Sequence, residues 1–177
     1  AEVTPHHLCL TDEACLEYGT EAKMNPPLRP EADRQALLAG LRDGTITVIA
    51  TDHAPHTAAE KAREFAVAPF GVVGLESAVP VCLTHLYHAG ELSLGRLIAA
   101  FTVGPREVLA LPYGSLAPGA PADVTLLDLE RPVTIETRAF RSKGRNCPFD
   151  GWTCQGAAVG TIVGGRWVHD ADGRGAA

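Results

Sequence analysis

The feature that most constrains the fold of this chain is a short apolar run that ends in a polar cluster. The run Ile46–Ala50 is rich in β-branched residues, and Thr51-Asp52-His53-Ala54-Pro55-His56 follows it directly. An apolar run of this length, without polar alternation, is typical of a strand buried on both faces of a parallel sheet. In parallel α/β folds, reactive residues gather where strands end and loops begin. The sequence therefore predicts an α/β layer with functional residues at Thr51–His56.

Helical segments surround this strand. Pro30 precedes a helix predicted over Glu31–Asp43, and Gly44 is placed to terminate it. The other predicted helices are Leu75–Ala89 with a break near Pro80, a helix capped by Ser93 that runs through Phe101, and a helix from Pro105 through Leu111. This alternation of strand and helix predicts a parallel sheet for the first 111 residues.

The composition of the sequence changes after Tyr113-Gly114. Short β-branched runs follow, separated by Gly, Pro and Asp, at Val124–Leu129, Val133–Ile135 and Val159–Val168. They predict a small β element, joined to the α/β layer by a linker at Leu116–Pro121. The sequence therefore divides into an α/β part, residues 1–113, and a β part, residues 114–177.

Charge and cysteine content narrow the function and the location. The 177 residues hold 15 Lys and Arg against 21 Asp and Glu, a net charge of −6. This balance argues against binding nucleic acid or an anionic membrane through bulk charge, and no apolar run approaches the ~20 residues of a membrane span. The cysteines contain no Cys-x-x-Cys pair, which favours reduced thiols in the core and a cytoplasmic location: Cys9, Cys15, Cys82, Cys147 and Cys154.

Asp52 is the strongest candidate for chemistry. It directly follows the apolar strand, where an ionised carboxylate is costly unless a cation or hydrogen-bond donors hold it. A carboxylate in this position suits a metal ligand or a general base. The spacing is equally compatible with a carboxylate that only caps the loop by accepting backbone N–H groups.

Other polar residues allow both functional and structural interpretations. His85 and His88 share a face of a predicted helix, but no third ligand lies at helical spacing, which favours a packing role. His6 and His7 are adjacent on a segment predicted to be extended, so at most one of them faces any given pocket. Asn25 precedes two prolines that stiffen its loop; it suits a substrate-reading amide, although the spacing alone favours a solvated side chain.

Taken together, these segments resemble dihydroorotases of the amidohydrolase superfamily. The matching segments, in chain order, are Glu2–Leu8, Asn25–Arg29, Thr51–His56, Pro69–Glu76, Gly119–Asp128 and Arg141–Phe149. The last two indicate only the superfamily, whereas the Asn-Pro-Pro-Leu-Arg, Thr-Asp-His-Ala-Pro-His and Phe-Gly motifs are specific for the dihydroorotase type. The fold implied by the resemblance is the C-terminal portion of a (β/α)8 TIM-type barrel, followed by a small β-sandwich segment.

The resemblance implies a zinc-dependent, reversible hydrolysis of dihydroorotate to N-carbamoyl-aspartate in pyrimidine biosynthesis, with one or two zinc ions in the intact site. The residue matching Asp52 ligates metal and shuttles the proton between the attacking water and the leaving amide nitrogen. Asn25, His56 and the backbone of Phe70-Gly71 match positions that hold the substrate. His6 and His7 match no ligand position of the family.

Several parts of the family's site have no match in this sequence. They are the His-x-His pair, the bridging carboxylate or carboxylated lysine, two further histidines, and the arginine that pairs with the substrate carboxylate. A whole barrel takes ~250 residues, and the chain opens at the end of a strand. The resemblance therefore predicts the C-terminal part of a dihydroorotase, inactive alone, with its other zinc ligands outside this chain.

Two alternatives stay open. One is a related cyclic-amide hydrolase, such as a dihydropyrimidinase or an allantoinase. The other is a non-catalytic, dihydroorotase-like subunit that supports aspartate transcarbamoylase. The partners implied by the resemblance are a small-molecule substrate and either a homodimer or a complex with that transcarbamoylase, without nucleic acid or membrane.

Overall fold

A short parallel strand pair and a three-stranded antiparallel sheet organise the chain. The structure is a computed structural model that describes residues 1–112 and 114–173, so Tyr113, at the predicted boundary between the two parts, lies outside the described residues. In chain order the elements are β1 (Glu2–Val3), α1 (Pro5–Cys9), α2 (Ala14–Tyr18), the 3-10 helix η1 (Gly19–Ala22), α3 (Glu31–Asp43), β2 (Val48–Ile49), α4 (Ala58–Lys61), α5 (Ala78–Cys82), the π-helix η2 (Leu83–His88), α6 (Leu94–Phe101), α7 (Val103–Val108), β3 (Val124–Thr134), the 3-10 helix η3 (Thr137–Ala139), β4 (Thr153–Val163) and β5 (Arg166–Asp170).

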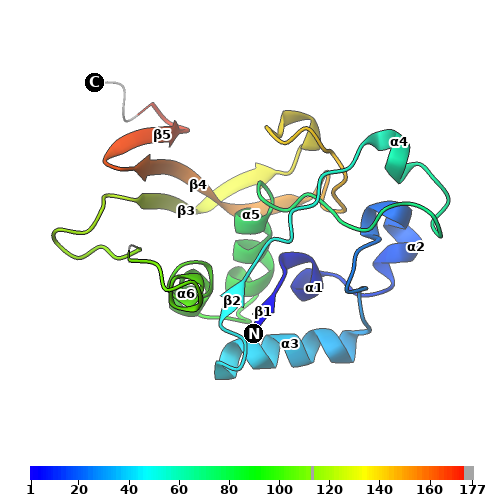
Figure 1. Cartoon of the computed structure of the whole chain (residues 1–177), viewed down its shortest axis with the longest axis horizontal. Helices are drawn as coiled ribbons and strands as arrows, with labels where there is room; N and C mark the ends of the chain where they lie inside the picture. Colours follow the sequence, from blue (N-terminus) through cyan, green and yellow to red (C-terminus); the bar gives the residue numbers. More distant parts are fainter. Residues whose placement is uncertain (113, 174–177) are drawn as a thin grey trace.

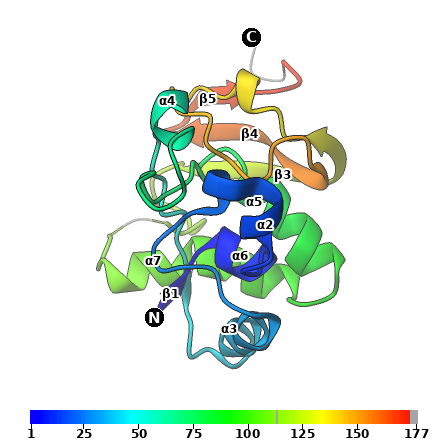
Figure 2. The ribbon, with the colours of Figure 1, turned by 90° about the vertical axis from the view of Figure 1, so that its right-hand side faces the viewer.

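The two sheets lie in different layers. Strands β1 and β2 are parallel, with Val3 opposite Ile49, while β3, β4 and β5 form an antiparallel sheet in that order. Figures 1 and 2 show this antiparallel sheet at one end of the molecule and α3 at the other, with β1, β2, α5 and α6 between them. The described residues thus form a mixed α/β structure in which no barrel closes.

Two apolar clusters form the core. The first packs α3, β1, β2 and α6 together around Leu38, Leu41, Leu86 and Leu97, all essentially buried. The second joins the loops after β1 and β2 to the segment after β3, and includes Met24, Val72, Val81, Phe149 and Cys154. Each fully buried aliphatic or aromatic side chain contributes about 1.5–3 kcal/mol. The second cluster therefore fixes the loops at one end of the parallel strands.

Local sequence signals account for two helices. Helix α3 spans Glu31–Asp43 as predicted, and it ends at Gly44, whose φ of 92° is the left-handed conformation that favours glycine. Helix α6 begins after Ser93 and ends at Phe101 as predicted. The Arg96 N–H donates a hydrogen bond of 3.3 Å to the Ser93 hydroxyl.

Two other helical segments differ from the prediction. The prediction over Leu75–Ala89 becomes α5 followed by the π-helix η2. The Thr84 hydroxyl donates to the Pro80 carbonyl at 2.8 Å and competes with the helical amide that would bond there, and the Ala89 N–H reaches the Thr84 carbonyl five residues back. Helix α7 begins two residues before Pro105 and ends at Val108, short of the predicted Leu111.

The extended conformation predicted for His6 and His7 is wrong. Both lie in α1, because Thr4 and Pro5 form a start signal: the Thr4 hydroxyl accepts the His7 N–H at 3.3 Å, and Pro5 occupies the first turn. The prediction of a single run over Val159–Val168 is also wrong. Gly164 and Gly165 both have positive φ and turn the chain from β4 into β5.

The runs Val124–Leu129 and Val133–Ile135 belong to a single segment rather than to two strands. Strand β3 continues through Thr134, with a register shift against β4 between Asp128 and Pro132. The β part is thus confirmed as β-rich, although its described residues form one sheet and not two. No helix of the described residues is long and apolar enough to cross a membrane.

Candidate active site

Three segments meet at the carboxyl end of the parallel strand pair. The Ala54 N–H donates to the Val72 carbonyl at 2.9 Å, and His53 forms a parallel bridge with Val72. The Gly71 N–H donates to the Lys23 carbonyl, also at 2.9 Å. These bonds bring together the loops that carry Asn25, His56 and Phe70-Gly71, which the sequence placed in one substrate site.

His56 connects two of these loops. Its Nε2 lies 2.8 Å from the Phe70 carbonyl oxygen, so Nε2 carries the proton and donates it to that oxygen. The His56 backbone N–H donates to the Asn146 side-chain oxygen at 2.9 Å. The imidazole is half-buried and is held in one orientation by these contacts.

Gly71 is required by close packing. A Cβ at this position would lie 2.5 Å from the Ala54 Cβ, and its φ is 118°. Both facts exclude a larger residue without a shift of the loop. The neighbouring Phe70 side chain is 56% exposed, so an apolar ring borders the site on the solvent side.

Asp52 is exposed and adopts an uncommon backbone conformation. Its φ of 47° is left-handed, a region that Asp tolerates better than most residues. Within the described part of the chain, its carboxylate has no hydrogen bond or ion pair, so the loop-capping alternative finds no support. A strained residue just beyond a strand, with a free carboxylate, is typical of a functional position.

Asn25 is exposed and lies beside α1. The His7 ring spans the gap: its Nδ1 lies 2.6 Å from the Thr4 hydroxyl, and its Nε2 lies 2.9 Å from the Pro26 carbonyl oxygen. His7 thus ties the loop of Asn25 to the end of β1. His6 is buried at 2% exposure, and burial together with the neighbouring His7 lowers its pKa to about 3.

Asn146 is a site residue that sequence reasoning missed. It is 4% exposed, and its amide group donates to the carbonyls of Ala54 at 2.9 Å and Gly71 at 3.0 Å, while its oxygen accepts from His56. One buried amide therefore holds two loops of the site. The available signal was a polar residue inside a motif of the resemblance, Arg145-Asn146-Cys147, but no pattern placed it beside His56.

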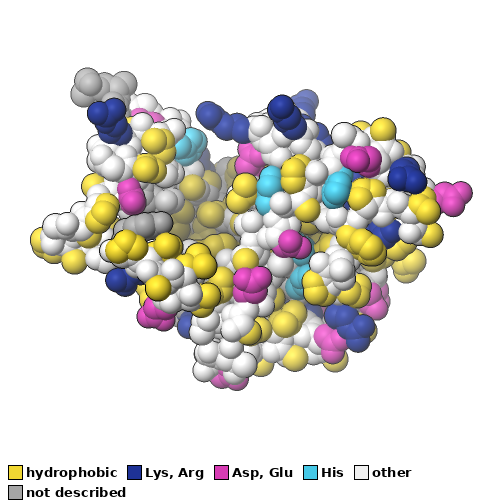
Figure 3. All heavy atoms as spheres, in the orientation of Figure 1, with side chains coloured by type: hydrophobic (Ala, Val, Ile, Leu, Met, Phe, Trp, Pro, Cys, Tyr) yellow, Lys and Arg dark blue, Asp and Glu magenta, His cyan; other side chains and the backbone are white. Residues whose placement is uncertain are grey.

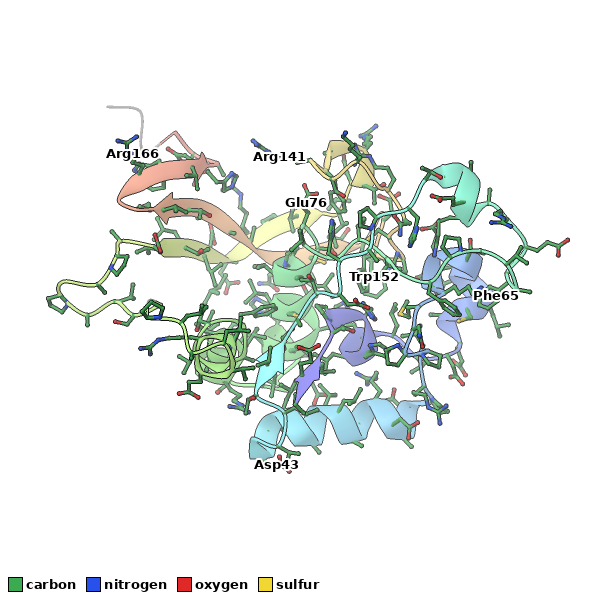
Figure 4. The ribbon with its side chains drawn as sticks, in the orientation of Figure 1. Asp43, Phe65, Glu76, Arg141, Trp152 and Arg166 are labelled. Atoms are coloured by element: carbon green, nitrogen blue, oxygen red, sulfur yellow. The ribbon has the colours of Figure 1, made fainter. Side chains whose placement is uncertain are left out.

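A carboxylate and a histidine fasten the segment after β3 to the same region. The Glu76 carboxylate accepts the backbone N–H groups of Arg141 at 2.7 Å and Ser142 at 3.0 Å; Figure 4 shows Glu76 and Arg141 on the same side of the molecule. The His53 Nδ1 accepts the N–H of Gly74 at 3.1 Å. The other ring nitrogen of His53, Nε2, lies 3.5 Å from the Ser142 hydroxyl.

The described residues do not assemble a metal site. Residues 1–112 and 114–173 contain no group of three or more His, Cys, Asp or Glu side chains placed to hold an ion. Figure 3 shows histidine and acidic side chains scattered over the face in view rather than gathered at one point. Asp52 is thus the one predicted ligand here, and the predicted zinc does not fit the described side chains alone.

The histidine pair of the predicted helix is structural. The His85 ring packs on Trp152 with 5.0 Å between ring centroids, and His88 Nε2 lies 2.8 Å from the Leu129 carbonyl oxygen. Burial lowers the pKa of His85. Both contacts agree with the packing role favoured by the sequence.

Sequence comparison places the chain in a known protein family. The sequence model of the amidohydrolase family matches residues 4–168, and the chain belongs to this family. Within the family it is related to dihydroorotases. It is 55% identical over 170 residues to the dihydroorotase of Halalkalibacterium halodurans and 52% identical over 170 residues to that of Bacillus subtilis. Each match covers 96% of this chain and 40% of the relative, so the chain spans about 40% of the length of these proteins.

Solved structures show the same fold in other proteins. The L-hydantoinase (dihydropyrimidinase) from Arthrobacter aurescens matches with a TM-score of 0.91 and 31% identity, over 96% of this chain and 39% of that one. The dihydropyrimidinase from Brevibacillus agri matches with a TM-score of 0.87 at 22% identity, over the same shares. The α/β layer and the antiparallel sheet of this chain thus occur together in part of a larger structure.

Proposed function

We propose that this chain carries the proton-transferring carboxylate and part of the substrate site of a dihydroorotase. The observation that carries the proposal is the meeting of three loops, joined by the Gly71–Lys23 and His56–Phe70 hydrogen bonds, at the strand end that bears Asp52. The 55% identity to a dihydroorotase supports this reaction over the others of the family.

Asp52 takes the role of general base and then general acid. In the hydrolysis of a cyclic amide, water adds to the ring carbonyl, and the ring nitrogen leaves with a proton. Asp52 accepts the proton from the attacking water and delivers it to that nitrogen, which opens the ring to the carbamoyl amino acid. An exposed carboxylate without a bonding partner among the described residues is free to exchange this proton.

Asn25, His56 and the backbone of Phe70-Gly71 hold the substrate. An amide such as Asn25 pairs with the imide edge of the ring, since it both donates and accepts hydrogen bonds. His56 is kept in place by Phe70 and Asn146, so it offers a fixed imidazole to the substrate carboxylate. The described side chains do not form a zinc site by themselves, so a zinc ion in the intact site would take its other ligands from outside this chain.

The proposed activity implies a location and a division of the chain. Residues 1–113 contribute to the catalytic (β/α)8 barrel and residues 114–177 to a β domain beside it. The five cysteines are free thiols, which agrees with a reducing, cytoplasmic setting.

A second candidate is hydrolysis of another cyclic amide. The match to L-hydantoinase at 31% identity and a TM-score of 0.91 supports it. The identity to dihydroorotases is higher, and for this reason the first candidate is preferred. Comparing dihydroorotate with hydantoin, dihydrouracil and allantoin as substrates distinguishes the two. A non-catalytic role beside aspartate transcarbamoylase predicts instead co-purification with that enzyme and no turnover of any of these compounds.

The test is reconstitution of activity. The 177-residue chain is assayed with dihydroorotate and zinc, alone and after co-expression with the part of the H. halodurans dihydroorotase that it does not match. We expect turnover in the reconstituted complex and its loss, by about 10³-fold or more, with Asp52→Asn, which keeps the shape and the left-handed backbone. A reconstituted complex that turns over hydantoin in preference to dihydroorotate supports the second candidate. Near-normal activity of Asp52→Asn contradicts the assignment of the base.

A further inference from the structure

Two buried lysines lie beneath the substrate loop, and neither belongs to the proposed catalytic group. Lys23 is 6% exposed and Lys61 is 2% exposed, although lysine is rarely buried without a reason. Both side chains come from segments that border the site: Lys23 lies two residues before Asn25, and Lys61 ends helix α4. We propose that these lysines are positioning residues, which fix the peptide groups of Pro69–Gly71 so that the Phe70 N–H faces the substrate.

Lys61 binds the carbonyl groups on both sides of Phe70. Its Nζ donates to the carbonyl oxygens of Gly71 at 3.0 Å, Pro69 at 3.3 Å and Lys23 at 3.4 Å. All three protons of the ammonium group therefore point at backbone carbonyls. Because two of those carbonyls flank Phe70, the ammonium group draws both ends of the Phe70-Gly71 segment toward the interior.

Lys23 binds the loop that precedes the same segment. Its Nζ donates to the carbonyls of Phe65 at 2.5 Å, Ala68 at 2.6 Å and Ala66 at 3.2 Å. The ammonium nitrogen also lies 4.5 Å from the centre of the Phe70 ring, within the range of a cation–π contact. Figure 4 places Phe65 at the outer edge of the molecule, on the loop that leads to Pro69. Among the described residues, no other side chain binds three carbonyls of this loop.

The geometry of the peptide bond then fixes where the Phe70 N–H points. In a trans peptide the C=O and the N–H that follows it point in opposite directions. The Pro69 carbonyl points at Lys61, so the Phe70 N–H points away from it. The Gly71 N–H is already bonded to the Lys23 carbonyl, whereas the Phe70 N–H has no hydrogen bond among the described residues. Of the two amides in this motif, that of Phe70 is the free donor.

The charge of the pair agrees with an anionic ligand. Two ammonium groups lie beneath the loop; burial and the neighbouring Lys23 lower the pKa of Lys61, while the Glu21 carboxylate favours its charged form. One Glu21 oxygen is buried without a hydrogen-bond partner among the described residues, and burial raises the pKa of this carboxyl. A substrate with a carboxylate, such as the one in the proposed function, is favoured over a neutral ring at such a site. This inference rests on the proposed function for the identity of the substrate.

The test compares four variants of the chain with the unaltered chain in the reconstituted complex. Lys61→Met and Lys23→Met remove the donors with little change in volume. Arg96→Met is the matched control: the Arg96 guanidinium donates to the carbonyls of Leu41 at 2.6 Å and Ile46 at 2.7 Å, at the other end of β2. Two quantities are measured, the hydrogen-exchange rate of peptides covering residues 65–73 and the dissociation constant for dihydroorotate.

We expect exchange in residues 65–73 and the dissociation constant to rise about tenfold or more in both lysine variants, and to stay within about twofold in Arg96→Met. Lys23→Arg keeps a cation and hydrogen-bond donors at this position, so we expect it to raise both quantities less than Lys23→Met does. Faster exchange with unchanged binding, or an equal rise in Lys23→Arg and Lys23→Met, overturns the positioning role. If the unaltered complex does not bind dihydroorotate, the proposed function itself fails and the positioning role with it, which is a distinct result.

Discussion

Asn146 shows how much of the site depends on one buried amide. Replacement by Ala leaves the Ala54 carbonyl and the His56 N–H without their protein partner in a largely buried place. Each unsatisfied buried group costs about 1–3 kcal/mol, so we expect Asn146→Ala to lower the free energy of unfolding by about 2–4 kcal/mol. Urea unfolding measures this change. The control is Gln155→Ala on the exposed face of β4, which we expect to stay within about 0.5 kcal/mol.

His6 makes stability depend on pH. Its pKa is about 3 in the folded chain and close to 6.5 in the unfolded chain, so below pH 6.5 the unfolded state binds a proton that the folded state does not. The stability is fully present above pH 6.5 and falls as the pH drops toward 3. From pH 7 to pH 5 the expected loss is about 2 kcal/mol.

The measurement is urea unfolding at several pH values for the unaltered chain and for His6→Leu. Between pH 7 and pH 5, we expect the free energy of unfolding of the unaltered chain to fall by about 2 kcal/mol more than that of His6→Leu. His169→Gln, at an exposed position of β5, serves as the control. Parallel curves for the unaltered chain and His6→Leu contradict the assignment to His6.

At the scale of single residues, the sequence predicted which loops meet better than it predicted the side-chain contacts that join them. The motifs that carry Asn25, His56 and Phe70-Gly71 were expected in one site, and the structure brings their loops together through backbone bonds. The roles of these residues stay predictions. Asn146, Lys23 and Lys61 were missed, because their partners are carbonyls up to 92 residues away in the chain, and no local pattern reports such contacts.

Among the helices, α6 and α7 carry two glycines with opposite requirements. Gly95 is exposed in α6, and a Cβ there meets nothing within 4 Å. Gly104 is buried in α7, and a Cβ there would lie 2.0 Å from the Thr47 carbonyl oxygen. The close approach of α7 to the start of β2 thus depends on Gly104.

This contrast gives a paired prediction. Gly95→Ala is expected to stabilise the chain by about 0.5–1 kcal/mol through helix propensity. Gly104→Ala is expected to destabilise it by about 2 kcal/mol or more, because the backbone has to move away from β2. Thermal unfolding of both variants checks this. Equal effects of the two substitutions would show that α7 does not pack on β2 as described.

The elements predicted well are those with signals at both ends. Helix α3 has Pro30 before it and Gly44 after it, and α6 has the Ser93 cap. The conformation of α1 was missed because apolar and β-branched residues before it suggested a strand, and the Thr4-Pro5 start signal was given too little weight. The π-helix η2 depends on a Thr84 contact that also reaches Gln155 in β4, so tertiary structure decided it.

At the scale of the whole molecule, the α/β class follows from the alternation of strand and helix, and the division near residue 113 stays a prediction. The number of strands in the parallel layer could not be counted from the sequence. Strand β1 has two residues, and what identifies it as a strand is its register with β2, Glu2 opposite Val48. Short strands of this kind leave little periodicity to read.

The parallel pair β1–β2 predicts how the chain associates. In the described residues each of these strands pairs only with the other, so each presents one edge of backbone N–H and C=O groups to a further strand. Exposed edges of this kind pair with other chains. The matching proteins are about two and a half times as long, since 40% of each is covered, and we expect the part that is not matched to supply the strands that pair with these edges.

We therefore expect sedimentation velocity to show self-association of the chain alone, and a one-to-one complex when it is co-expressed with the unmatched part of the H. halodurans dihydroorotase. The complex should also unfold at a higher temperature than the chain, because an occupied edge removes unpaired backbone groups. The control is Trp167→Ser on β5, in the other sheet, which should leave the complex intact. A chain that stays monomeric at high concentration, melts cooperatively and forms no complex would show that the β1–β2 edges need no partner.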